Sequence, residues 1–101
     1  MSAESMGGGQ DATPVHDPAS QRWTVDLEGQ RSLLDYRLAD GIVTIRHTEV
    51  PQPLGGRGIA GRLVGAVFDW ARAEGYKVRP ACAYAAAWVQ RHPEQSDIVV
   101  P

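Results

Sequence analysis

The segment from residue 54 to residue 63 reads Leu54-Gly55-Gly56-Arg57-Gly58-Ile59-Ala60-Gly61-Arg62-Leu63. It follows an apolar run that ends at Val50, and a helical pattern begins within it near Gly58. The first amides of a helix have no partner inside the helix, and the helix dipole makes that end positive. A glycine-rich turn that opens a helix therefore predicts a phosphate-binding loop, with a plain tight turn as the alternative.

Three segments before the loop alternate apolar and polar residues, as half-buried strands do. They lie at 23–27, at 33–38 and at Ile42–Val50. The pair Asp40-Gly41 between the second and third segments is typical of a two-residue hairpin turn. We therefore expect the chain to begin its ordered part with an antiparallel meander of three strands.

The pattern changes after the loop. From Gly58 to Glu74 the apolar residues recur at helical spacing, and Gly75 provides a stop. A short strand at Lys77–Arg79 and an alanine-rich helix at Ala83–Arg91 follow. The predicted fold class is α/β with a mixed sheet, in which the fourth strand lies parallel to the third. The loop then sits at the carboxyl end of the third strand, where open α/β sheets place their ligands.

The composition narrows the class of protein. A chain of 101 residues with 43% hydrophobic residues allows one packed domain. We expect a disordered tail over residues 1–20 and a folded domain over 21–101. A formal net charge of −2 argues against a nucleic-acid partner, and the single Cys82 excludes an internal disulfide or a cysteine-based metal cluster. With no membrane-length apolar run and no leader pattern, we expect a cytoplasmic protein without a membrane partner or a metal.

Two groups of motifs resemble a known family. The first is Thr48-Glu49-Val50-Pro51, then Gly56-Arg57-Gly58-Ile59-Ala60 and Leu63, and the second is Arg79-Pro80-Ala81-Cys82-Ala83-Tyr84 followed by Arg91-His92-Pro93. Together they resemble the GCN5-related N-acetyltransferases (GNAT), and within them the small, single-domain YjdJ-type branch. The resemblance covers about residues 23–99. It implies a GNAT-like fold, acetyl-CoA as co-substrate and transfer of an acetyl group to an amine.

The resemblance also implies which residues hold acetyl-CoA. Its pyrophosphate would rest on the backbone amides of Arg57, Gly58, Ile59, Ala60 and Gly61, with Arg62 adding positive charge. The pantetheine would pair with the backbone of the third strand near Glu49 and Val50. The family loop usually opens with Gln or Arg where this chain has Gly55, so a side-chain contact is lost and weaker binding is expected.

Candidate catalytic residues flank the predicted acetyl position. Cys82 is interpreted either as a nucleophile or pocket-lining group, or as a small buried side chain. Glu49 and His47 lie two apart on one strand and share a face with Val43 and Ile45, so either could be a general base, or simply a structural residue. Tyr84 could protonate the departing CoA sulfur or could be an aromatic core residue.

Two other classes of function stay open at this point. One is a CoA-binding module with little or no catalytic activity, because the chain is shorter than typical family enzymes. The other is an interaction protein that keeps the fold and uses an open face for a partner. The acceptor amine, whether a small molecule or a protein lysine, is not specified by the sequence. We expect a monomer or a weak homodimer.

Overall fold

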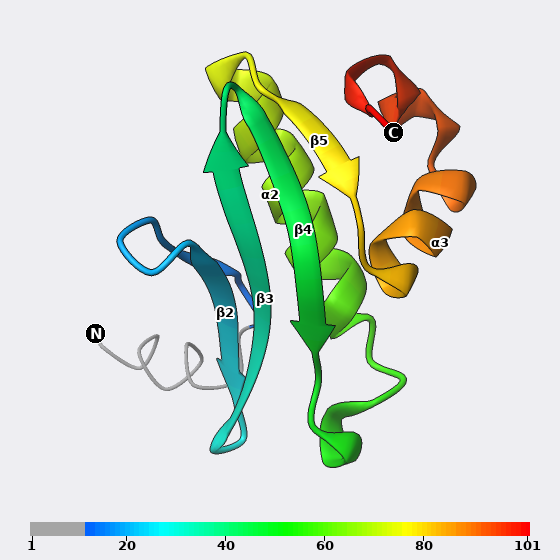
Figure 1. Cartoon of the computed structure of the whole chain (residues 1–101). Coiled ribbons are helices and arrows are strands. Elements are labelled where there is room, and N and C mark those ends of the chain that lie inside the picture. Colours follow the sequence, from blue (N-terminus) through cyan, green and yellow to red (C-terminus); the bar gives the residue numbers. More distant parts are fainter. Residues whose placement is uncertain (1–11) are drawn as a thin grey trace.

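Residues 12–101 are described by the computed structural model, and Figure 1 shows how their elements are arranged. In chain order the elements are β1 (Val15–Asp17), β2 (Arg22–Leu27), β3 (Gln30–Ala39), β4 (Ile42–Glu49), the short 3-10 helix η1 (Gln52–Leu54), α2 (Ile59–Glu74), β5 (Lys77–Pro80), α3 (Ala83–Arg91) and the 3-10 helix η2 (Pro93–Ile98). From β2 onward, the predicted order of strands and longer helices is confirmed.

The strands of the described part of the chain form one mixed sheet with the order β1-β2-β3-β4-β5. Neighbouring strands are antiparallel from β1 to β4, whereas β4 and β5 are parallel. Helix α2 supplies the crossover that a parallel pair requires. The predicted α/β fold with a parallel last strand is therefore confirmed.

Tight turns set the register of the meander. Asp40 and Gly41 have φ values of 55° and 74°, and Ala39 pairs directly with Ile42 across them. Positive φ at both central residues defines the turn type that suits the twist of a two-residue hairpin. The predicted hairpin is confirmed. The turn between β2 and β3 has the same form, with φ values of 53° at Glu28 and 74° at Gly29.

Helix α2 covers one face of the sheet, and α3 packs beside it, beyond β5 (Figure 1). The buried positions of α2 recur at intervals of three and four residues and are Ile59, Leu63, Val64, Val67, Phe68 and Ala71. Removing such a stripe from water is the main stabilising contribution to a fold of this size. Trp88 of α3 packs on Phe68 with 5.1 Å between ring centroids. We call the opposite side of the sheet the open face, because no helix of residues 12–101 covers it.

A β-bulge reverses which side of the sheet the side chains at the end of β4 face. Tyr36 pairs with Ile45 but Asp35 pairs with His47, so Arg46 is an extra residue on β4. Before the bulge, Val43 and Ile45 are fully buried. After it, the side chains of His47 and Glu49 are 57% and 64% exposed. The expectation that all four residues share one face is wrong, because an inserted residue reverses the alternation.

The prediction of a disordered tail over residues 1–20 is wrong in part. Residues 15–17 form β1, which pairs with β2 from Val15 opposite Thr24 to Asp17 opposite Arg22. His16 stacks on Trp23 with 4.3 Å between ring centroids. This aromatic contact helps to hold β1 against the sheet, although the segment has few apolar residues. The rest of that prediction, over residues 1–11, lies outside the described residues.

Candidate functional site

The loop between β4 and α2 needs glycine at two places. Gly56 and Gly58 have φ values of 81° and 76°, in the left-handed region that side-chain-bearing residues rarely adopt. Gly58 is also the residue that caps the N-terminus of α2. Leu54, immediately before the loop, is fully buried and fixes the loop against the core. The glycine pattern in the sequence therefore specifies a definite backbone path.

The first turn of α2 offers uncapped amides to a ligand. No side chain caps this helix end, and its first turn contains no acidic residue. In an α-helix, amides such as those of Ile59 and Ala60 have no partner within the helix. They border a hollow of about 240 Å³ that we call the loop pocket. It is lined by Val50, Leu54, Gly55, Gly56, Gly58, Ile59, Ala60 and Tyr84.

Three of the predicted cofactor residues do not line this pocket. The Arg57 Nη1 donates to Glu28 Oε2 at 2.7 Å, and this bond lowers the pKa of the Glu28 carboxyl. Arg62 is exposed and does not line the pocket. A Cβ at Gly61 would lie 3.4 Å from the Tyr84 hydroxyl, so Gly61 allows α3 to approach α2 closely. By contrast, Val50, Gly58, Ile59, Ala60 and Tyr84 are brought together.

Cys82 caps the second helix. Its Sγ accepts a hydrogen bond from the Ala85 amide at 3.4 Å, which satisfies one of the free amides of α3. The same sulfur lies 3.6 Å from Thr48 Oγ1 on β4. These contacts join the start of α3 to the end of β4, and the thiol is partly buried between them.

The strands β4 and β5 stop pairing before β4 ends. The last paired residues are Ile45 and Pro80, and the amides of Ala81 and Cys82 both donate to the Ile45 carbonyl at 3.1 Å. Within residues 12–101, the backbone from residue 46 to residue 49 has no partner on the β5 side. A strand edge of this kind is available to an extended ligand.

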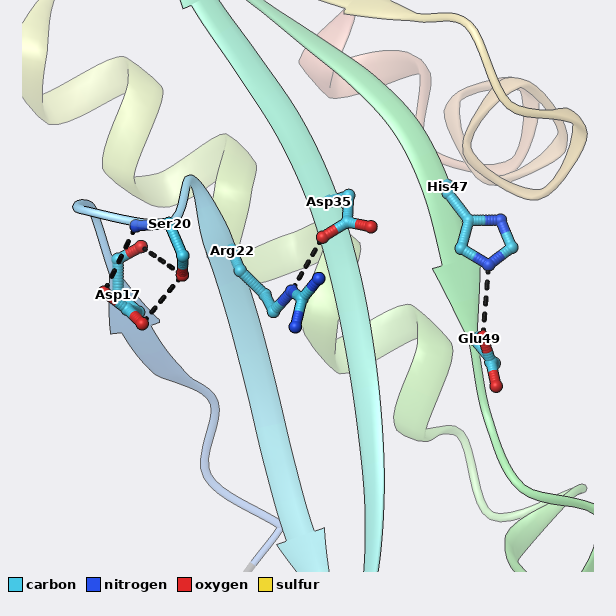
Figure 2. Close-up of polar contacts among 6 residues, drawn as sticks. All are labelled: Asp17, Ser20, Arg22, Asp35, His47 and Glu49. Carbon is cyan, nitrogen blue, oxygen red and sulfur yellow. Dashed lines mark hydrogen bonds and ion pairs between the residues drawn. The ribbon is translucent and has the colours of Figure 1, made fainter.

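Charged side chains gather on the open face at the bulge (Figure 2). Direct cross-strand pairing places Arg22, Asp35 and His47 in one row across β2, β3 and β4. Arg22 Nε donates to Asp35 Oδ1 at 2.7 Å, and His47 Nε2 lies 3.3 Å from Glu49 Oε1. Arg22, Asp35, Arg46 and His47 line a hollow of about 310 Å³, which we call the bulge hollow.

The candidate catalytic residues are thus divided between two faces. Cys82 contacts Thr48 and Tyr84 lines the loop pocket, both on the helix side of β4. Glu49 lies on the open face beside His47. Sequence analysis missed Arg22, which joins the site only through the strand register. Alternating charges in a strand are also typical of a solvated face, so no local signal marks it.

Residues 12–101 contain neither a metal-binding cluster nor a membrane-spanning helix. No group of three or more His, Cys, Asp and Glu side chains in residues 12–101 is arranged to hold a metal ion. No helix in that same range is long and apolar enough to cross a membrane.

Comparison with known proteins defines the class. Residues 22–98 match the family described as GCN5-related N-acetyl-transferase, and this stretch contains the loop, the bulge and both helices. The chain belongs to the GCN5-related N-acetyltransferase family. The resemblance to this family is therefore confirmed, and the assignment to its YjdJ-type branch stays a prediction.

Particular relatives share much of the sequence. Protein NATD1 of Bos taurus and that of Homo sapiens are each 34% identical to this chain over 97 residues, which cover 90% of this chain and 86% of each relative. NATD1 of Gallus gallus is 37% identical over 81 residues, covering 77% and 74%. The solution NMR structure of a GCN5-like protein from Staphylococcus aureus matches with a TM-score of 0.71 at 23% identity. It covers 91% of this chain and 89% of that protein, and it supports the fold.

Proposed function

We propose that this chain binds acetyl-CoA at the loop pocket and transfers its acetyl group to an amine that enters from the open face. One observation carries the proposal. The loop before α2 combines two glycines in the left-handed region with a helix N-terminus that no side chain caps. Membership of a family named for N-acetyl transfer supports the same assignment.

The residues present fit the phosphate groups of acetyl-CoA. The amides of Gly58, Ile59 and Ala60 border the loop pocket and would hold the pyrophosphate, since helix N-termini favour anions. Backbone groups would provide most of this binding, because the Arg57 guanidinium is already paired with Glu28. Arg62, exposed in the first turn, would add positive charge.

The backbone at the end of β4 would position the rest of the co-substrate. Val50 lines the loop pocket, and the β4 backbone before it has no β5 partner within residues 12–101. The pantetheine would pair there as an added strand. When bound, acetyl-CoA supplies a thioester whose acetyl group would lie where β4 and β5 separate, between the loop pocket and the bulge hollow.

The chain's own residues would handle the protons. An amine is protonated at neutral pH, so the His47–Glu49 pair would take one proton before the nitrogen can react. The nitrogen then bonds to the acetyl carbonyl carbon as the carbon–sulfur bond breaks. Tyr84 would donate a proton to the departing sulfur, and the nitrogen would lose its second proton as the amide forms. That proton would return through water to Tyr84. Most of the rate enhancement would come from holding the two reactants in register.

Cys82 is assigned a supporting place in this scheme. Its sulfur already accepts from the Ala85 amide and contacts Thr48, so it fixes the wall beside the acetyl position. We propose that the acetyl group passes directly to the amine and does not pass through the thiol.

An assay of CoA thiol release tests the proposal. Acetyl-CoA is mixed with the protein and with spermidine, a lysine-containing peptide or no amine. The proposal predicts release above the amine-free rate for at least one amine. Binding of acetyl-CoA without amine-dependent release would favour a CoA-binding module, a role that fits the uncovered open face. Absence of acetyl-CoA binding would favour an interaction protein.

A further inference from the structure

A third hollow lies at the other end of α2, away from the glycine loop. It has a volume of about 550 Å³ and is larger than the loop pocket or the bulge hollow. Trp70 follows the start of α2 by 11 residues, which places it about 16 Å along the helix at 1.5 Å per residue. We call this hollow the aromatic pocket. Figure 1 shows how far apart the two ends of α2 lie.

Aromatic side chains form much of its wall. Trp70 lies 5.1 Å from Tyr36 and 5.5 Å from Tyr76 between ring centroids, and the Trp70–Tyr76 pair is edge-to-face. His16 closes one side, with its Nε2 2.6 Å from the Tyr36 hydroxyl. Trp70 and Tyr76 are only partly buried, and both line the pocket. Aromatic faces carry negative electrostatic potential and attract cations.

The aromatic pocket is lined by a negatively charged group. Among the lining residues in the described range, Glu74 is the one with a carboxylate, and it forms no ion pair there. It is also the last residue of α2, where the helix dipole is negative. Burial lowers the pKa of His16, against the opposing effect of Asp17, and so disfavours a positive charge on this ring. Lys77 does not line the pocket, and its Nζ donates to the Asp97 carbonyl oxygen at 3.5 Å.

These features discriminate between classes of ligand. An anion would meet Glu74 and the negative end of α2. A metal ion would find a single carboxylate and no cluster of ligating side chains in residues 12–101. A neutral apolar molecule would leave the carboxylate unused. An alkylated ammonium group matches both parts of the wall, because its weakly hydrated cation can lie against rings while its charge is balanced nearby.

We propose that the aromatic pocket binds a small molecule with a trialkylammonium group, held by Trp70 and Tyr76 and balanced by Glu74. The pocket shares no lining residue with the loop pocket, and it adjoins the bulge hollow through Gln21 and Tyr36. The proposal does not depend on acetyl transfer, because Trp70, Tyr76 and Glu74 line neither of those two hollows. It would give the protein a second ligand site at the far end of the helix that carries the first.

An NMR titration tests this inference with two probes of nearly the same shape. Choline carries the ammonium charge, and 3,3-dimethylbutan-1-ol replaces the charged nitrogen with carbon. Choline is expected to shift the Trp70 indole signal and the amide signals of Glu74 and Tyr76, at constant ionic strength. The neutral alcohol is expected to bind roughly threefold to tenfold more weakly, because it lacks the charge. No shift at tens of millimolar choline, or equal binding of the two probes, would overturn the proposal.

Paired substitutions locate the site. Glu74→Gln keeps the size of an exposed side chain and should weaken choline binding about threefold or more by removing one charge. Glu94→Gln removes an exposed charge in η2 that does not line the pocket, and binding should be unchanged. Tyr76→Leu should also weaken binding while the amide spectrum stays folded. Equal affinities in Glu74→Gln and Glu94→Gln would refute the assigned role of the carboxylate.

Discussion

Near the carboxyl end of β4, backbone groups line one side of the strand and polar side chains line the other. On the helix side, the loop pocket is walled largely by glycine backbone, small apolar residues and the start of α2. On the open face, the bulge hollow is lined mostly by polar residues of β2, β3 and β4 and of the turn before β2. The loop pocket suits a group that is the same in every reaction, such as the pyrophosphate of acetyl-CoA. The side chains of the bulge hollow can differ between proteins that use different acceptor amines. Substitutions on the two sides should therefore have separable effects.

The largest effect is expected on the open face. His47→Gln removes the proposed proton acceptor, and general bases typically contribute about 100-fold or more to a rate. Turnover with an accepted amine should fall by roughly that factor, while acetyl-CoA affinity stays the same. Steady-state rates and calorimetric titration measure the two quantities. Glu49→Gln, which removes the partner of His47, should lower turnover less. Unchanged turnover in both variants would remove the pair from the mechanism.

A smaller effect, and one confined to binding, is expected on the helix side. Gly58→Val strains a residue with φ of 76° and adds methyl groups at the border of the loop pocket. The Kd for acetyl-CoA should rise about tenfold or more, equivalent to about 1.4 kcal/mol. Gly75→Val is the matched control, because Gly75 has φ of 80° at the other end of the same helix. Equal losses of affinity in the two variants would mean that only helix stability matters.

Substitutions of Cys82 test whether its thiol takes part in the reaction or only supports the structure. Cys82→Ser preserves an N-cap side chain, so stability and turnover should stay near those of the natural chain. Cys82→Ala removes the acceptor for the Ala85 amide and should cost about 0.5 to 1 kcal/mol of unfolding free energy. Urea denaturation and the thiol-release assay measure both. A large loss of turnover in the serine variant, with stability intact, would instead favour a nucleophilic thiol.

The smallest effect is expected at an ion pair remote from both sides. Arg72 holds Asp97 through two bonds of 2.8 and 2.9 Å, and this lowers the pKa of Asp97 from 3.8 to about 2. A lowered folded-state pKa stabilises the fold above pH 3.8 and loses that contribution as the pH falls toward 2. Asp97→Asn should therefore lower the melting temperature slightly at neutral pH, because the pair is exposed and screened.

Acid titration of the melting temperature provides the check on that pair. The gap between the natural chain and Asp97→Asn should narrow below pH 3.8 and close near pH 2. It should also shrink in high salt, since exposed charges are screened. A gap that stays constant over this range would show that Asp97 acts through packing and not through charge.

The contrast between the two sides also explains what the sequence could predict. Alternation, the Asp40-Gly41 pair and the glycine loop are local signals, and the strand order, hairpin and helix start that they predict are all confirmed. The bulge at Arg46 has no local signal, because an extra residue shows only when the pairing of β3 with β4 is known. Without it, simple alternation along the strand assigns His47 and Glu49 to the wrong face.

The same limit applies to the aromatic pocket and to β1. Trp70 and Tyr76 lie in separate elements from Tyr36, and only the fold brings the three rings together. His16 lies in a segment with little hydrophobic content, yet its ring packs against Trp23 and Trp70. Contacts between residues far apart in sequence depend on topology, which composition does not report.

An amide NMR titration with acetyl-CoA tests the central claim most directly. The account predicts shifts concentrated at Val50, at residues 56–61 and around Cys82, with weaker effects on the row formed by Arg22, Asp35 and His47. Phosphate-dependent shifts should persist with free CoA, because the loop is proposed to bind the pyrophosphate. No shifts at millimolar acetyl-CoA, or shifts that avoid residues 56–61, would contradict the assignment of the glycine loop as the cofactor site.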